Sequence, residues 1–490
     1  MTYDTLIRQA LIIDGSNTEG YVADVGLCDG RIETIGDLST AAAVHEIDAT
    51  GRVLAPGFID VHTHDDTVVI RQPQMLPKLS QGVTTVIVGN CGISASPVSL
   101  RSDPPDPMNL LGSAAAFVYP RFSDYRSAVE SAHPAVNVAA LIGHTALRSN
   151  HMDDLHRTAT ADEIAAMRVQ LHESLEAGAL GLSTGLAYAS AFNAETDEVL
   201  QLSEELTAFG AVYTTHLRSE FEPVLEAMDE AFLIGRHAQV PVIISHLKCA
   251  GAGNWGRSPQ LLAALESAAK THPVGCDCYP YAASSSTLDL KQVTDAFRIT
   301  ITWSTPHPEV GGRDLQDIAG EWDVSLMDAA RRLQPAGAVY YGMDEADVRR
   351  ILAHPLSMVG SDGLPEDPFP HPRLWGAFPR VLGHFSRDVG LFPLHTAVHK
   401  MTGLSAARFG LSERGEIREG HWADLVLFDP LRVRDVADFK APQCAAEGIE
   451  SVWVNGVQSY SNGQANTQRA GRFLARSGDL RQGFKWESGT

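Results

Sequence analysis

Short apolar runs recur through the middle of the chain and alternate with segments of helical periodicity. Runs of this length that are apolar almost throughout are typical of parallel strands buried on both faces. Eight buried strands separated by helices predict an α/β fold, a (β/α)8 or TIM barrel. The eight runs are GFIDVH (57–62), VTTVIVG (83–89), VNVAALIG (136–143), GALGLSTG (178–185), AVYTTH (211–216), VPVIISH (240–246), PVGCDCYP (273–280) and SMVGSD (357–362).

Several segments between the runs carry helix signals. Thr160 precedes an amphipathic stretch that continues to Glu176, and Glu163 completes a capping box with it. The segment TDEVLQLSEELTAFG (196–210) has the same periodicity. The stretch from about 280 to 356 is too long for one crossover, so we expect an inserted lid subdomain at about 285–345.

Both ends of the chain alternate apolar and polar residues with the period of β-strands. Asn455-Gly456 lies between two such runs and is typical of a hairpin turn with positive φ. We therefore expect one small β-sandwich domain built from residues 1–55 and 406–490, with residues 56–405 forming the barrel.

Composition narrows the function. The chain has 490 residues and a formal net charge of −22, which is too acidic for a nucleic-acid binder. It contains no apolar run long enough to span a membrane, and its start, MTYDTLIRQALIIDG, lacks the apolar run of a signal peptide. We expect a cytoplasmic monomer or homodimer that acts on a small molecule and binds neither nucleic acid nor membrane.

The six cysteines are too sparse for a disulfide scaffold, so a functional cysteine is expected to be a ligand. The Cys276-Asp277-Cys278 segment has no second cysteine pair at zinc-finger spacing. We therefore do not expect that segment to bind metal.

Residues with metal-ligand chemistry follow five of the predicted strands. His62 and His64 are two positions apart, so strand alternation places both imidazoles on one side. Because the carboxyl ends of barrel strands meet on one face, residues at these ends should converge. Thiolate and imidazole donors with a carboxylate favour zinc over magnesium or calcium. The predicted set is His62, His64, Cys91, His216, His246 and Asp362.

These positions resemble the pattern of the amidohydrolase superfamily. Its members carry His-x-His on the first barrel strand, single histidines on the fifth and sixth, and a catalytic aspartate on the eighth. Many members bridge two metals with a carboxylated lysine from the fourth strand, but GLSTG (181–185) has no lysine, and Cys91 can replace it. Longer motifs are similar to those of the D-aminoacylase branch, the N-acyl-D-amino-acid deacylases. They are GVTTVIVGNCGISASP (82–97), THLRSE (215–220), ISHLKCAG (244–251), CYPYAASSSTL (278–288) and GSDGLPEDPFPHPRLWG (360–376).

The resemblance implies zinc-dependent hydrolysis of the amide bond of N-acyl-D-amino acids to a carboxylate and a free D-amino acid. One zinc ion would bind tightly to Cys91, His216 and His246. A second, weaker position would lie near His62 and His64 and share Cys91 and Asp362. Zinc lowers the pKa of a bound water to about 7 and polarises a carbonyl, and Asp362 would carry the proton from water to the leaving nitrogen.

The same resemblance assigns residues to the α-carboxylate of the substrate. They are Lys248, Tyr279 and Arg373, with a hydroxyl added by Ser285 or Ser286. The choice of substrate side chain should depend on the stretch 284–298, where Lys291 and Arg298 are cations. The apolar neighbours in that stretch slightly favour neutral side chains.

Three more residues, His144, Arg218 and Glu220, are expected on the catalytic face without an assigned place in the site. Two other functions stay open. A cyclic-amide hydrolase of the dihydropyrimidinase type would normally need the missing bridging lysine. A catalytically inactive binding protein would be expected to lack some metal residues, yet all six are present.

Overall fold

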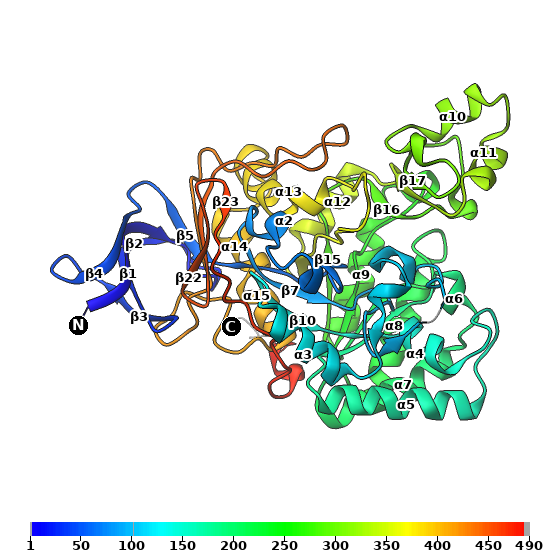
Figure 1. The fold of residues 1–490 in the computed structure, drawn as a ribbon, viewed down its shortest axis with the longest axis horizontal. Coiled ribbons are helices and arrows are strands. Elements are labelled where there is room, and N and C mark those ends of the chain that lie inside the picture. Colours follow the sequence, from blue (N-terminus) through cyan, green and yellow to red (C-terminus); the bar gives the residue numbers. More distant parts are fainter. Residues whose placement is uncertain (1, 101, 485–490) are drawn as a thin grey trace.

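The computed structural model describes residues 2–100 and 102–484 (Figure 1). In this part of the chain, eight parallel strands lie where the eight apolar runs predict them. The TIM-barrel prediction is confirmed. The barrel strands are β6 (Phe58–Asp60), β7 (Val83–Val88), β10 (Asn137–Ala140), β12 (Gly181–Gly185), β13 (Val212–His216), β14 (Val242–Ile244), β15 (Val274–Cys278) and β19 (Ser357–Val359).

Backbone hydrogen bonds continue around the barrel. The parallel pairs run from β6 through β7 to β10, and from β11 (Ile142–Gly143) through β12 to β19. The Leu141 N–H donates to the Val88 carbonyl at 2.9 Å, and the Leu180 N–H donates to the Ala140 carbonyl at 2.8 Å. A parallel bridge between Thr63 and Gly363 joins the first strand to the last. The carboxyl ends of the strands therefore surround one mouth.

Apolar residues from strands around the barrel pack into one buried cluster, so the interior is a core and not a channel. Among them are Ile59, Ile87, Val212, Ile243 and Met358. Helices pack between successive strands on the outside. The longer ones are α3 (Phe122–Ala132), α4 (His144–His151), α5 (Ala161–Glu176), α7 (Thr196–Phe209), α8 (Val224–Ala238), α9 (Ser258–Ala269), α12 (Glu345–Ala353), α13 (Arg373–Arg380), α14 (Leu394–Met401) and α15 (Gly403–Phe409).

Helix α5 begins as predicted. The Thr160 hydroxyl accepts a hydrogen bond from the Glu163 N–H at 3.3 Å, and the Glu163 carboxylate accepts one from the Thr160 N–H at 2.8 Å. This reciprocal pair satisfies two N–H groups that the first helical turn would otherwise leave free.

The two chain ends share one sheet at the side of the barrel (Figure 1). Its central contact is antiparallel pairing of β5 with β20, with Leu54 opposite Leu427. Asn455 and Gly456 have φ of 49° and 79° and form the predicted hairpin between β21 and β22. The ends therefore form one β-rich unit. Its strands are β1 (Thr2–Ile12), β2 (Tyr21–Cys28), β3 (Arg31–Gly36), β4 (Ala42–Asp48), β5 (Val53–Pro56), β20 (Leu425–Phe428), β21 (Ile449–Val454), β22 (Val457–Ser461) and β23 (Gln464–Ala465).

An antiparallel sheet with its own helices is inserted after β15. Its strand order is β16 (Ser284–Thr287), β18 (Ala336–Tyr340), β17 (Ile299–Ser304). Helices α10 (Leu315–Glu321) and α11 (Leu326–Leu333) cover it, and the unit has a separate apolar core. Figure 1 shows this unit at the opposite end of the molecule from the sheet of the two termini.

The exact domain boundaries stay predictions: 1–55 and 406–490 for the β-sandwich, 56–405 for the barrel and about 285–345 for the inserted lid. Within the described ranges, none of the helices has both the length and the hydrophobicity needed to cross a bilayer.

Candidate metal centre

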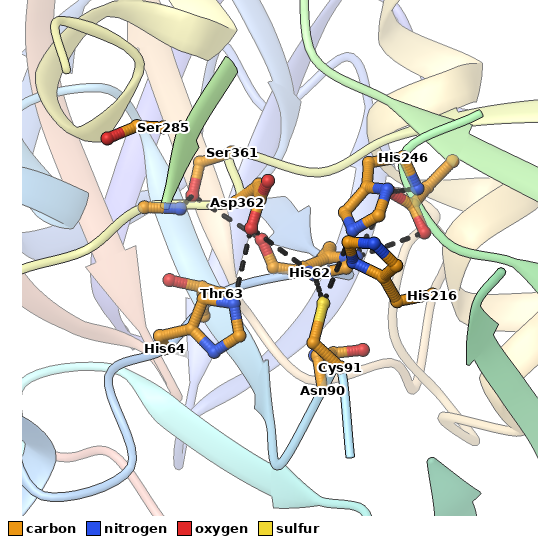
Figure 2. Close-up of polar contacts among 12 residues, drawn as sticks. His62, Thr63, His64, Asn90, Cys91, His216, His246, Ser285, Ser361 and Asp362 are labelled. Carbon is orange, nitrogen blue, oxygen red and sulfur yellow. Dashed lines mark hydrogen bonds and ion pairs between the residues drawn. The ribbon is translucent and has the colours of Figure 1, made fainter. Parts of the chain in front are cut away.

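The six predicted metal residues converge at the mouth of the barrel (Figure 2). Each lies at or just after the end of a strand, so the barrel geometry brings together residues far apart in sequence. His62 and His64 follow β6, Cys91 follows β7, His216 ends β13, His246 follows β14, and Asp362 follows β19.

Their ligand atoms form two groups that share Cys91. The first group is Cys91, His216 and His246, and within it Cys91 Sγ lies 3.3 Å from His246 Nε2. Within each group, the ligand atoms lie within 4.8 Å of one another. The second group adds His62, His64 and Asp362 to Cys91.

The second group is equally close. Cys91 Sγ lies 3.2 Å from His62 Nε2, and Asp362 Oδ1 lies 3.4 Å from His62 Nε2 and 3.2 Å from His64 Nε2. Figure 2 shows the sulfur atom between the imidazoles of the two groups. One thiol can therefore serve either group.

The electrostatics of the cluster suit a cation. Burial opposes ionisation of the Cys91 thiol, but the nearby His62 and His246 lower its pKa well below the usual value. The Nδ1 atoms of His64 and His216 are buried and have no hydrogen-bond partner among the described residues. A thiolate with imidazole donors is the donor set that zinc prefers, so these residues fit a zinc ion.

Asp362 is shared between the metal residues and Arg373. Its Oδ1 lies near the two histidines, and its Oδ2 lies 2.8 Å from Arg373 Nη1. Burial opposes ionisation of this carboxyl, but Arg373 and His62 hold its pKa well below the usual range. Asp362 is therefore a carboxylate at neutral pH, able to accept a proton.

Glu220 contacts both histidines of the first group, His216 and His246. Its Oε1 lies 2.9 Å from His246 Nδ1 and also accepts a hydrogen bond from the Lys248 ammonium. Its Oε2 lies 3.8 Å from His216 Nε2. Burial would raise the pKa of Glu220, but Lys248 and the two histidines lower it. This residue lacked an assigned role in the sequence, and the structure places it against two metal residues.

A cavity of about 980 Å³ opens directly onto the cluster. Its walls include Tyr188, Lys248, Tyr279 and the segment 284–292 of the inserted unit. The hydroxyls of Tyr279, Ser285 and Ser286 are buried without a hydrogen-bond partner in the described part of the chain. Unpaired buried hydroxyls at a cavity wall are available to a polar ligand.

A model of the amidohydrolase family matches residues 45–460. The chain is 50% identical over 475 residues to the D-aminoacylase of Alcaligenes xylosoxydans xylosoxydans, a match that covers 97% of this chain and 98% of the relative. The chain belongs to the amidohydrolase family. This confirms the resemblance inferred from the motifs.

Two solved structures of this family superpose closely. A structure from work on the binuclear metal centre of D-aminoacylase gives a TM-score of 0.95 at 50% identity, covering 97% of this chain and all of that one. N-acyl-D-glutamate deacylase from Bordetella bronchiseptica, solved with zinc and a phosphonate inhibitor, gives 0.94 at 44% identity with the same coverage.

Three further polar residues of this amidohydrolase are engaged by protein partners. Arg373 is fully buried and lies behind Tyr279, with its guanidinium carbon 4.5 Å from the ring centroid. His144 is buried in a separate network, where its Nε2 lies 2.8 Å from Glu198 Oε1. Arg218 pairs with Glu230 at 2.7 Å. Arg218 borders the cavity, and within the described part of the chain neither Arg218 nor His144 forms a hydrogen bond or ion pair with a metal residue.

Two residues that contact the cluster gave little signal in the sequence. Tyr188 follows β12, and its ring centroid lies 4.8 Å from that of His216. Asp277 lies between Cys276 and Cys278, and its carboxylate contacts His62 and the His246 backbone N–H. An acidic residue in the middle of a buried strand was the sequence signal that could have identified it, because a buried acid needs a polar or charged partner.

We expect the Cys91→Ala variant to lose bound zinc and, with it, activity. Both groups lose their shared donor, so zinc retained after dialysis should fall at least about tenfold, as judged by elemental analysis. Cys444→Ala, a matched thiol removal outside the cluster, should retain the zinc of the wild type. Wild-type zinc content in Cys91→Ala would exclude a ligand role.

Proposed function

We propose that this amidohydrolase catalyses zinc-dependent hydrolysis of N-acyl-D-amino acids to a carboxylate and a free D-amino acid. The observation that carries the proposal is the position of Cys91, with its Sγ 3.2 Å from His62 Nε2 and 3.3 Å from His246 Nε2. Full-length similarity to a D-aminoacylase supports the substrate class. So does the deacylase solved with a phosphonate that mimics the tetrahedral intermediate.

Cys91, His216 and His246 would bind the tightly held zinc ion, and His62, His64 and Asp362 would complete a weaker second position with Cys91. When bound, zinc supplies a Lewis acid that makes water a better nucleophile and polarises the substrate carbonyl. The histidines and the thiolate fix the place of that chemistry at the cavity floor.

Asp362 carries the proton in this proposal. Its carboxylate borders the cavity and lies between His64 and Arg373. It takes a proton from the attacking water and gives it to the amide nitrogen, which must be protonated before it leaves. The amine product and the acyl carboxylate then separate.

Lys248, Tyr279, Ser285 and Ser286 would bind the α-carboxylate, with the charge of Arg373 acting on it from behind Tyr279. The first four border the cavity, and three of them contribute the unpaired hydroxyls. In the free protein Lys248 is occupied by Glu220 and Arg373 by Asp362. Carboxylate binding would therefore rest first on the hydroxyls, with the cations adding long-range attraction.

The two alternatives lack comparable support. A hydrolase of cyclic amides would normally use a bridging lysine on the fourth strand, and β12 carries none. An inactive binding protein would have no reason to keep all six ionisable residues within reach of one another.

We expect the zinc-loaded protein to hydrolyse N-acetyl-D-leucine or N-acetyl-D-glutamate, and to leave dihydrouracil intact. Exhaustive chelation should abolish turnover and added zinc should restore it. Release of the free amino acid, measured by a ninhydrin assay, checks this. Faster hydrolysis of the L-isomers would contradict the substrate class, and full activity without metal would contradict the chemistry.

Asp362→Asn should lower kcat strongly, because the amide cannot accept the proton. Loss of a general acid-base group costs about 10² to 10⁴ in rate. KM should change little, and the isosteric substitution keeps the shape of the site. Asp347→Asn, which changes a buried carboxylate on the outside of the barrel, serves as the control. Wild-type kcat in Asp362→Asn would rule out the proton-transfer role.

Lys291 should influence the choice of substrate side chain. It borders the cavity, whereas Arg298 stacks on Tyr341 at 3.7 Å and is absent from the cavity wall. We expect Lys291→Met to lower the ratio of kcat/KM for N-acetyl-D-glutamate over N-acetyl-D-leucine by about two- to fivefold, the range of an exposed ion pair. Lys270→Met, at the end of α9, should leave the ratio unchanged.

A further inference from the structure

The segment Cys276-Asp277-Cys278 has no role in the chemistry above, although it lies on strand β15 beside the cluster. The two cysteines do not face the metal residues. Cys278 Sγ lies 3.4 Å from Ser357 Oγ, and Cys276 Sγ lies 3.9 Å from the Leu356 carbonyl. Burial raises the pKa of both thiols, that of Cys278 to about 12, so both stay protonated.

Strand alternation turns Asp277 to the opposite face, where its carboxylate meets two histidines. Its Oδ1 accepts a hydrogen bond from the His246 backbone N–H at 2.9 Å and lies 3.3 Å from His62 Nδ1. Its backbone carbonyl accepts a hydrogen bond from the Leu247 N–H at 2.8 Å. One buried residue therefore contacts both metal groups, and it does so through atoms that are not metal ligands.

These contacts determine how each imidazole is presented. A carboxylate only accepts hydrogen bonds, so it selects the His62 tautomer with its proton on Nδ1. The lone pair on Nε2 then faces Cys91 and Asp362. The bond to the His246 N–H fixes a backbone with φ of 37°, and that backbone aims Nε2 at Cys91.

The neighbouring strand is shaped to leave space for this arrangement. A Cβ added to Gly360 would lie 2.5 Å from the His62 Cβ and 3.2 Å from Asp277 Oδ1. Only glycine lets His62 and Asp277 approach the end of β19 this closely. The contact between His62 and the Asp277 carboxylate therefore requires a residue without a side chain at position 360.

We propose that Asp277 is a positioning residue that sets the tautomer of His62 and the backbone of His246, and so aligns both metal positions. The inference rests on the proposed function only in that zinc occupies those positions. The His246 segment is also held by the backbone bond from the Leu247 N–H to the Asp277 carbonyl, whereas Asp277 contacts His62 through the carboxylate alone. The second, His62-containing position therefore depends on the carboxylate most.

The test is a zinc titration of the metal-free protein with Asp277→Asn and Asp277→Ala. In Asp277→Asn the amide oxygen can still accept from the His246 N–H, but the amide NH₂ would donate to His62 Nδ1 and favour the wrong tautomer. We expect the first zinc affinity to stay within about threefold of wild type and the second to fall about 10- to 100-fold. Asp277→Ala should weaken both.

Cobalt substitution supplies a second readout. With one equivalent of cobalt, which fills the tighter position first, the sulfur-to-cobalt absorption reports Cys91 there and should persist in Asp277→Asn. Asp347→Asn is the matched control for loss of a buried carboxylate and should bind both ions as the wild type does. Thermal unfolding of each metal-free variant identifies any that fail to fold.

Equal second-ion affinity in Asp277→Asn and wild type would overturn the proposal, and so would a wild-type protein that binds one zinc ion at every concentration. Loss of both ions in a folded Asp277→Asn would show a general structural role instead. These titrations need no turnover. A wild type that binds zinc but hydrolyses no N-acyl-D-amino acid would refute the proposed function alone.

Discussion

The ionisable groups at the mouth of the barrel are largely buried, and a buried charge is tolerated only beside an opposite charge or several hydrogen-bond partners. Lys78 shows the constraint most clearly. Its fully buried ammonium lies 2.7 Å from Asp60 Oδ2, 2.9 Å from Thr63 Oγ1 and 3.0 Å from Ser361 Oγ. These partners lie on or just after the first and last strands, so one ion-pair network joins the barrel where the histidines and the Asp362 carboxylate emerge.

Three residues at the same mouth of the barrel have a strained, left-handed backbone conformation. Cys91, His246 and Asp362 have φ of 54°, 37° and 50°, in the left-handed region that costs non-glycine residues about 1–3 kcal/mol each. Each follows a strand and turns its side chain into the cluster. Hydrogen bonds maintain the turns, including one from the Asp362 N–H to the His62 carbonyl at 2.7 Å. Backbone hydrogen bonds therefore help to hold these side chains in the cluster.

Local pattern in the sequence was sufficient for the barrel strands, the capping box of α5 and the hairpin at Asn455, because each depends on neighbouring residues. The convergence of the six residues could be predicted because barrel geometry converts strand ends into spatial neighbours. Glu220 and Asp277 could not be assigned, because their partners are set by side-chain direction across the barrel. Of the two cations of the inserted unit, Lys291 borders the cavity and Arg298 does not. The alternation of residues along the sequence could not distinguish them, because it does not give the strand register.

The inserted unit and the barrel contribute different parts of the cavity wall. It has an apolar core of its own and contributes residues 284–292 to the cavity wall, whereas the metal residues all come from barrel strand ends. Lys291 Nζ lies 4.7 Å from the ring centroid of Phe192, which follows the fourth barrel strand, so the two units meet across the cavity. Because Lys291 and Phe192 are both exposed, we expect substitutions at this contact to change the cavity wall without disturbing the buried charges beneath it. The ion-pair networks at the barrel mouth therefore do not involve this exposed part of the cavity wall.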